Sequence, residues 1–273
     1  MKILLATDGS SPARDAATLL AGFGWRETDE IRILTVDNTR GYLATSEILR
    51  QAQEDLAHTA ARVEIMMRQG YADEEILAAC REWPADLLVM GAKGSSGFSR
   101  FLLGGTTARI IRHATSSVLV ARPAKPAVRH VLVGFDDSQS SRAAALSLTS
   151  LPLPESAEVE LVSVLPPLDP SSPQFHTPTF PSGVTELQVL EDLAIYKGRL
   201  IAAGRRASTH TLRGGAAAAL LNHAELRGSD LVVLGSHGTS LSERFHRFLL
   251  GSVSEKVARY ASSHVLIVRQ PGE

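Results

Sequence analysis

Short runs of apolar, often β-branched residues alternate along the whole chain with longer segments that have the apolar periodicity of helices. Each run ends at glycine, aspartate or proline. In the first half of the chain the runs lie at residues 3–6, 31–36, 63–67, 86–91 and 117–122. Such runs are typical of strands buried on both faces of a parallel sheet. The alternation predicts an α/β fold with a five-stranded, doubly wound parallel sheet of the Rossmann-like type.

The same series of elements occurs a second time. The repeated runs begin at residues 131, 159, 209, 230 and 264. The first two follow their counterparts by 128 residues, and the last two by 144 and 147 residues. We therefore predict two tandem domains, residues 1–125 and 126–273, joined by the proline-containing linker 122–127. Most of the extra length of the second copy is the proline-rich stretch 166–183, which we interpret as an irregular surface loop.

The balance of acidic and basic residues limits the classes of partner that the chain could bind. The 273 residues include 28 Lys and Arg and 29 Asp and Glu, so the formal net charge is −1. This argues against a general nucleic-acid binder, which would carry a basic excess. The single cysteine, Cys80, excludes a disulfide framework and a cysteine-based zinc site. No apolar run approaches the roughly 18 residues of a membrane span. We expect a cytoplasmic protein without membrane or nucleic-acid partners.

Two glycine-containing clusters follow the fourth predicted strand of each copy. They lie at 91–94 and 104–107 in the first copy, and at 235–238 and 251–254 in the second. Each second cluster leads into a predicted helix. Glycine lets the backbone approach an anion closely, and the free N–H groups at a helix start attract negative charge. The clusters thus favour phosphate binding over ordinary turn chemistry, because they recur at corresponding strand ends.

Polar residues that follow the first and fourth predicted strands are further candidates for a binding site. Asp8 and Asp136 each follow a first strand and could contact a ribose hydroxyl or a metal-bound phosphate. The alternative is a helix N-cap satisfied by local N–H groups. Ser236 and His237 could form a nucleophile and base, but neighbours on one loop rarely face each other, so we expect no such pair.

The spacing Gly-x2-Gly-x9-Gly followed by Ser or Thr, together with the strand-ending aspartate, resembles the universal stress protein family. Residues 251–258, with the sequence GSVSEKVA, are typical of that family. The chain looks like a tandem member, in which two family domains are fused. The resemblance covers nearly the whole chain.

The resemblance implies an adenine-nucleotide-binding stress regulator, with ATP as the ligand and Mg²⁺ held through the phosphates. It assigns the aspartates to ribose or phosphates, the valines that end the second strands to the adenine pocket, and the glycine clusters to ribose and phosphates. The implied residues are Asp8, Val36, Met90, Gly91, Gly94, Gly104, Gly105, Thr106 and Thr107 in the first copy, and Asp136, Val164, Gly235, Gly238, Gly251, Ser252, Val253 and Ser254 in the second. Some members bind no nucleotide, so a partner-binding or structural module is the alternative.

Each copy departs from the family pattern in one respect. The first copy has Gly105 where the family prefers a hydroxyl, and Thr106 or Thr107 could replace it. The second copy keeps Ser252 but has three extra residues within 239–250. We expect at least one copy to bind ATP, with the first copy favoured for its intact spacing. No residue set supplies an evident base, so any hydrolysis should be slow.

The final strands of the two copies predict how the halves assemble. Single-domain members of the family usually pair through these strands, which here are residues 118–122 and 265–269. Apolar edge strands invite such pairing, and the short linker keeps the halves close. We expect an internal pseudo-dimer with pseudo-twofold symmetry, and further association of two chains into a homodimer is open.

Overall fold

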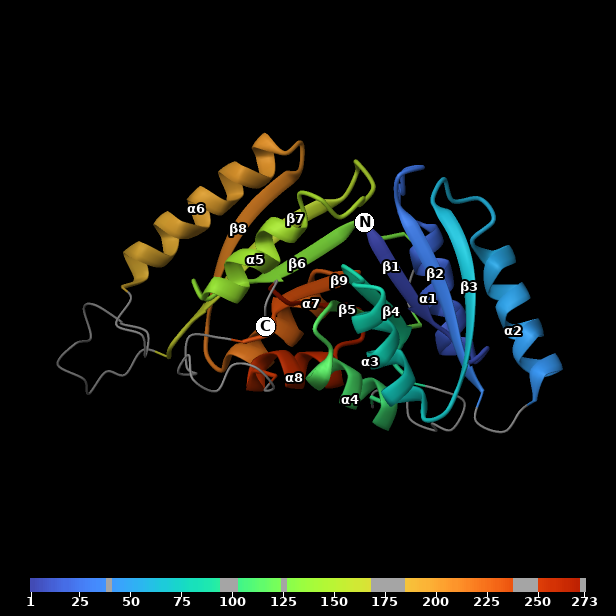
Figure 1. Ribbon diagram of the computed structural model, residues 1–273. Coiled ribbons are helices and arrows are strands. Elements are labelled where there is room, and N and C mark those ends of the chain that lie inside the picture. Colours follow the sequence, from blue (N-terminus) through green and yellow to red (C-terminus); the bar gives the residue numbers. More distant parts are fainter. Residues whose placement is uncertain (38–40, 94–102, 124–126, 168–184, 238–249, 271–273) are drawn as a thin grey trace.

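The computed structural model describes residues 1–37, 41–93, 103–123, 127–167, 185–237 and 250–270 (Figure 1). Strands and helices alternate along each half of the chain. The strands are β1 Lys2–Ala6, β2 Glu30–Asp37, β3 Arg62–Gln69, β4 Leu87–Gly91, β5 Ser117–Ala121, β6 His130–Gly134, β7 Glu158–Leu165, β8 Arg206–Arg213, β9 Leu231–Gly235 and β10 His264–Val268. The helices are α1 Ser11–Ala21, α2 Tyr42–Asp55, α3 Ala72–Glu82, α4 Gly105–His113, α5 Gln139–Ser147, α6 Glu186–Ala202, α7 Ala216–Leu226 and α8 Ser252–Tyr260.

All of these strands belong to one ten-stranded sheet in the order β3-β2-β1-β4-β5-β10-β9-β6-β7-β8. Neighbouring strands within each half are parallel. The two halves meet at β5 and β10, which pair antiparallel with Leu119 opposite Leu266. The predicted α/β fold with a mostly parallel sheet and alternating helices is confirmed.

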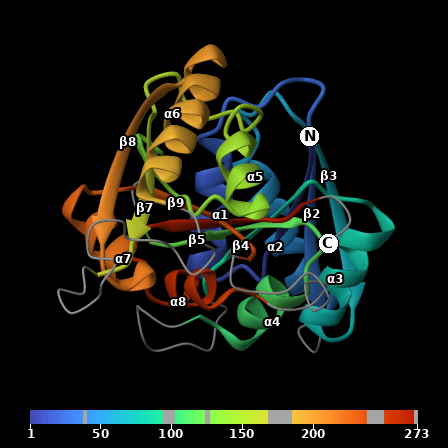
Figure 2. The same ribbon diagram turned by 90° about the vertical axis from the view of Figure 1, so that its left-hand side faces the viewer.

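Helices cover both faces of the sheet. Side chains of a strand alternate between the faces, so Ile3 and Leu5 belong to one core cluster while Leu4 and Ala6 belong to the other. The first cluster lies under α1, α2, α5 and α6, and the second under α3, α4, α7 and α8. Figure 2 shows α5 and α6 above the central strands, with α4 and α8 below them. Each cluster contains residues of both halves, so the two halves share their cores.

Side chains cap the starts of three helices. The side chain of Ser10 accepts a hydrogen bond from the backbone N–H of Ala13, and that of Ser138 accepts one from Ser141. Thr185 begins α6 with a capping box that it forms with Gln188. These contacts satisfy first-turn N–H groups that a helix leaves without internal partners.

Two buried arginines reinforce the junction between the halves. Arg122 of the first half donates from Nη2 to the backbone oxygen of Ala258 at 2.6 Å, near the end of α8. Arg269 of the second half donates to the oxygen of Ile111 at 2.8 Å, near the end of α4. A positive charge is favourable at a helix C-terminus. Each half therefore caps a helix of the other half, in addition to the pairing of β5 with β10.

Candidate functional site

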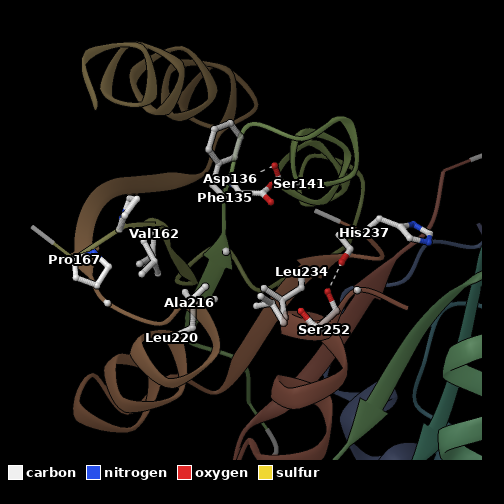
Figure 3. A pocket seen from close by; sticks show the side chains of 18 residues that line it. Phe135, Asp136, Ser141, Val162, Pro167, Ala216, Leu220, Leu234, His237 and Ser252 are labelled. Atoms are coloured by element: carbon white, nitrogen blue, oxygen red, sulfur yellow. Dashed lines mark hydrogen bonds between the residues drawn. The ribbon is translucent and has the colours of Figure 1, made fainter. Parts of the chain in front are cut away.

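A cavity of about 400 Å³ opens at the carboxyl ends of β6 and β9 in the second half (Figure 3). This is the edge where doubly wound sheets bind their ligands, and the volume is in the range of small-molecule sites. Its apolar wall consists of Phe135, Val162, Val164, Pro166, Pro167, Ala216, Leu220, Leu234 and Val253. Its polar lining includes Asp136, Ser141, His237, Ser252 and Ser254. The cavity thus combines one large apolar surface with a few polar groups.

The residues that the sequence assigned to the second copy converge on this cavity. Those that line it are Asp136, Val164, Gly235, Gly251, Ser252, Val253 and Ser254. Gly238 lies outside the described residues. Sequence reasoning missed most of the apolar wall, because Val162, Leu220 and Leu234 are ordinary core residues in sequence and only the fold brings them to the strand ends.

Sequence reasoning also missed Gly134, which lies at the end of β6. The corresponding residue of the first copy is an alanine, Ala6. A Cβ on Gly134 would lie 2.4 Å from Cδ2 of Leu234 and 3.2 Å from Cδ1 of Leu220. Both of these leucines line the cavity. An alanine at residue 134 would therefore displace two side chains of the wall. The difference between glycine in the second copy and alanine in the first is the sequence feature that could have identified this position.

The first glycine of each cluster has a packing role. A Cβ on Gly91 would lie 2.5 Å from the backbone carbonyl of Pro12, and a Cβ on Gly235 would lie 2.5 Å from the carbonyl carbon of Ser140. Real Cβ atoms do not approach backbone so closely. These two glycines let the first turns of α1 and α5 rest against the ends of β4 and β9.

The hydroxyl groups three residues beyond Gly104 and Gly251 are engaged within the protein. Thr107 donates from Oγ1 to the backbone oxygen of Gly91 at 3.1 Å, and Ser254 donates from Oγ to that of Gly235 at 2.7 Å. Each of these hydrogen bonds therefore links the start of a helix to the end of a strand. The first-turn N–H groups remain able to meet an anion here, because the N-cap residues Gly104 and Gly251 have no side chain to accept from them.

The aspartates that follow the first strands do not occupy the N-cap position. The N-caps are Ser10 and Ser138. Asp8 accepts a hydrogen bond at Oδ1 from the backbone N–H of Ser10 at 3.0 Å, and Asp136 accepts one from Ser138 at 3.1 Å. Both aspartates are half-buried. Each carboxylate is thus oriented by a local turn, and in the second half it borders the cavity.

Ser236 and His237 do face each other, contrary to the expectation from their adjacency. Oγ of Ser236 and Nδ1 of His237 are 2.9 Å apart, and both residues are buried. The backbone oxygen of His237 accepts from the hydroxyl of Ser140. In Figure 3 the His237 ring points away from the cavity, and Ser236 does not line it. The pair therefore stabilises the loop after β9 and does not present a nucleophile to the cavity.

The predicted residues of the first copy lie at equivalent strand and helix ends. Val36 and Met90 occupy the ends of β2 and β4, and Gly104, Gly105, Thr106 and Thr107 form the start of α4. Gly105 and Thr106 are exposed, whereas Thr107 is buried. Gly94 lies outside the described residues.

The described residues contain neither a cluster of metal ligands nor a membrane-spanning helix. No group of three or more His, Cys, Asp or Glu side chains among them could hold a metal ion. Within the same part of the chain, no helix has the length and apolar character needed to cross a membrane.

Comparisons with known proteins agree on one family. The model of the Universal stress protein family matches residues 1–122 and again 127–269. A universal stress protein of Synechocystis sp. is 31% identical over 121 residues, which are 44% of this chain and 42% of that protein. One of Mycolicibacterium smegmatis is 30% identical over 201 residues, 68% of this chain and 62% of that protein. The matched region thus spans less than two thirds of the length of either relative.

A solved structure supports the arrangement of the whole chain. The crystal structure of a universal stress protein from Archaeoglobus fulgidus DSM 4304 superposes with a TM-score of 0.66. The match covers 99% of this chain and 98% of that one, with 19% identical residues. At this identity the likeness concerns the fold, including its two-domain arrangement.

Proposed function

Because this chain is a tandem member of the universal stress protein family, we propose that it binds an adenine nucleotide, ATP, in the cavity of its second half. The observation that carries the proposal is the combination of a 400 Å³ apolar cavity with an uncapped helix start and a carboxylate at its rim. The apolar wall accommodates a flat base, and the polar groups suit a phosphorylated sugar.

The cavity suggests a pose for the ligand. The adenine would lie against Val164, Leu220 and Leu234. The ribose would lie near the carboxylate of Asp136, which can accept from its hydroxyls. The phosphates would extend to the N–H groups at the start of α8, where the helix dipole favours negative charge. Mg²⁺ would bind through the phosphate oxygens, which supply the hard oxygen ligands that this ion prefers.

The lining supports binding without rapid hydrolysis. Among the described lining residues, Asp136 is the carboxylate, and one of its oxygens is held by the N–H of Ser138. The ring of His237 points away from the cavity in Figure 3. Neither group is placed to activate water at the start of α8. We propose a regulatory protein in which the nucleotide acts as a bound ligand rather than as a substrate that is turned over.

A matched pair of substitutions tests which half binds. Ser252 and Gly105 are both exposed first residues of their helices. A glutamate there suits the helix dipole, so both variants should fold, but its charge would repel phosphates. We expect Ser252→Glu to weaken ATP binding at least about tenfold by calorimetry, and Gly105→Glu to leave it unchanged. Loss of binding only in Gly105→Glu would transfer the site to the first half.

Two further titrations separate this proposal from its alternative. The apolar wall and nearby backbone groups should prefer adenine to guanine, so ATP should bind more tightly than GTP. A nucleotide-free partner-binding module predicts no saturable heat with ATP, AMP or cyclic AMP. Equal affinities for ATP and GTP would contradict recognition of the base, even if phosphate binding remained.

A further inference from the structure

Two arginines of the first half contact α8, the helix whose first turn lines the cavity of the second half. Arg122 lies at the last turn of α8, where its Nη2 donates to the backbone oxygens of Ala258 at 2.6 Å and of Arg259 at 3.2 Å. Arg112, on α4, donates from Nη2 to Oε1 of Glu255 in the first turn of α8, at 3.0 Å. The helices α4 and α8 are neighbours in both ribbon views (Figure 1 and Figure 2). The first half therefore places a positive charge at each end of α8.

No acidic side chain balances the charge of Arg122 in the part of the chain that the structure describes. The residue is 2% exposed, and burial lowers the pKa of its guanidinium, although arginine stays protonated in proteins. Salt and water screen a buried charge much less than a surface charge, so its field extends further. The nine residues of α8 make a helix about 13 Å long. The field of Arg122 therefore reaches the first turn, where we place the phosphates.

The charge of Glu255 opposes phosphate binding at the same turn. The residue lies three positions after Ser252, which lines the cavity, and a carboxylate there repels an anion at the first-turn N–H groups. Arg112 of the first half offsets this charge at 3.0 Å, and Arg259 of α8 itself approaches the same oxygen at 3.9 Å. The residue of α4 that corresponds to Glu255 is Ala108. The helix start of the second half thus carries an acid that the first half neutralises.

We propose that Arg122 and Arg112 of the first half supply part of the positive potential that holds the phosphates at the start of α8. The inference rests on the proposed function and makes the nucleotide site of one half dependent on charges of the other. Both arginines act through α8 and do not touch the ligand. Because the attraction grows with the negative charge of the ligand, it should be largest for ATP, smaller for AMP and absent for adenosine.

Arg269 provides a matched control, because it is the counterpart of Arg122 in the second half. It is 7% exposed, and its Nη2 donates to the backbone oxygens of Ile111 at 2.8 Å and of Arg112 at 3.2 Å, at the end of α4. Arg122→Gln and Arg269→Gln each remove one buried charge and keep an amide that can donate to these carbonyls. Their effects on folding should be similar, whereas their distances from the start of α8 differ.

Calorimetry of the full chain with three ligands tests the role of Arg122. We expect Arg122→Gln to weaken ATP binding about three- to tenfold, to weaken AMP binding less, and to leave adenosine binding unchanged. Arg122→Lys keeps the charge and should retain the wild-type affinity for ATP to within about twofold. Arg269→Gln should leave the affinities for all three ligands within about twofold of the wild type.

A second series uses the partly exposed pair of Arg112 and Glu255, which can be changed without disturbing the core. Arg112→Gln leaves the acid less balanced and should weaken ATP binding about threefold. Adding Glu255→Gln removes the acid and should restore the affinity. This series remains decisive if Arg122→Gln fails to fold, which circular dichroism and the melting temperature would reveal.

Tripolyphosphate separates the inference from the proposed function, because it carries the phosphate charge without the base. Its affinity should follow the same order among the variants as that of ATP. If the order holds but ATP binds no more tightly than tripolyphosphate, the inference stands and adenine binding is wrong. If ATP binds to the wild type and Arg122→Gln and Arg269→Gln weaken it equally or not at all, the inference is wrong and the proposed function stands.

Two further results would also overturn the inference. A loss in Arg122→Gln that is equal for adenosine and ATP would assign Arg122 to the packing of α8 alone. A wild-type chain that binds neither ATP nor tripolyphosphate would contradict both the proposed function and the inference.

Discussion

The strand-end edges of the two halves share a backbone plan but differ in the side chains that build the wall. Both edges have a glycine that admits a helix start, an aspartate held by a local turn, and a helix that begins after a glycine N-cap. Four of the residues that line the cavity of the second half are Gly134, Val162, Leu220 and Leu234. Their first-half counterparts are Ala6, Leu34, Ile76 and Met90.

The residues at these four positions differ in size. At two of the four positions the second half has the smaller residue, Gly134 for Ala6 and Val162 for Leu34. The duplicated scaffold therefore supplies the groups that suit phosphate and ribose, while the wall decides how much room remains for a base. Because interiors are densely packed, a change of one methyl group is enough to alter such a space.

The largest effects are expected where the two halves agree. Gly91→Ala and Gly235→Ala each place a Cβ about 2.5 Å from backbone atoms, which cannot rotate away. Each should lower the free energy of unfolding by at least about 2 kcal/mol, measured by urea denaturation. Gly105→Ala is the control, because a Cβ there meets nothing within 4 Å. A loss of less than about 0.5 kcal/mol in Gly91→Ala or Gly235→Ala would disprove the packing role.

The next effect should appear where the halves differ. Gly134→Ala copies the first-half residue into the second half and pushes the ends of Leu220 and Leu234 into the cavity. Because these ends are flexible, the cost should fall on the cavity more than on stability. We expect about tenfold weaker ATP binding by calorimetry, and a further loss when Val162→Leu is added. Unchanged affinity in the double variant would mean that the wall does not limit binding.

Much of the fold followed from the sequence, whereas the shape of the cavity did not. Buried strands and serine N-caps have local signatures, and the duplication made each one visible twice. The wall of the cavity depends on which core side chains reach the strand ends, and Val162, Leu220 and Leu234 are indistinguishable from other core residues in sequence. The engagement of the Ser254 hydroxyl likewise depends on a strand-end carbonyl 19 residues away, which no local pattern reveals.

A smaller difference concerns the carboxylates. Asp136→Asn keeps an oxygen that can accept from the N–H of Ser138, so the turn should persist. It replaces the charged carboxylate, which would accept from ribose hydroxyls, by a neutral amide. Charged acceptors make stronger hydrogen bonds than neutral ones. ATP affinity should fall about three- to tenfold, by roughly 1 kcal/mol. The same change at Asp8 serves as the control. An equal loss in Asp8→Asn would indicate that both halves bind nucleotide.

The smallest effect distinguishes the cores of the two halves. The first half has Cys80 in α3 where the second has Ala224 in α7. Burial raises the pKa of the Cys80 thiol to about 11. The unfolded thiol ionises near its ordinary pKa of about 8.5, so between these values the unfolded state holds fewer protons than the folded one. This contribution to stability is therefore complete below about pH 8.5 and is lost as the pH rises toward 11.

Cys80→Ala gives the first half the residue of the second and removes this titration. In urea denaturation between about pH 8.5 and 10, the free energy of unfolding of the wild-type chain should fall more steeply than that of Cys80→Ala. The difference in slope should approach but not exceed about 1.4 kcal/mol per pH unit. The thiol should also resist alkylation at pH 8, because about one molecule in a thousand carries the thiolate and the side chain is 2% exposed. Equal pH slopes for the wild-type chain and Cys80→Ala would show that folding does not raise the pKa of the Cys80 thiol.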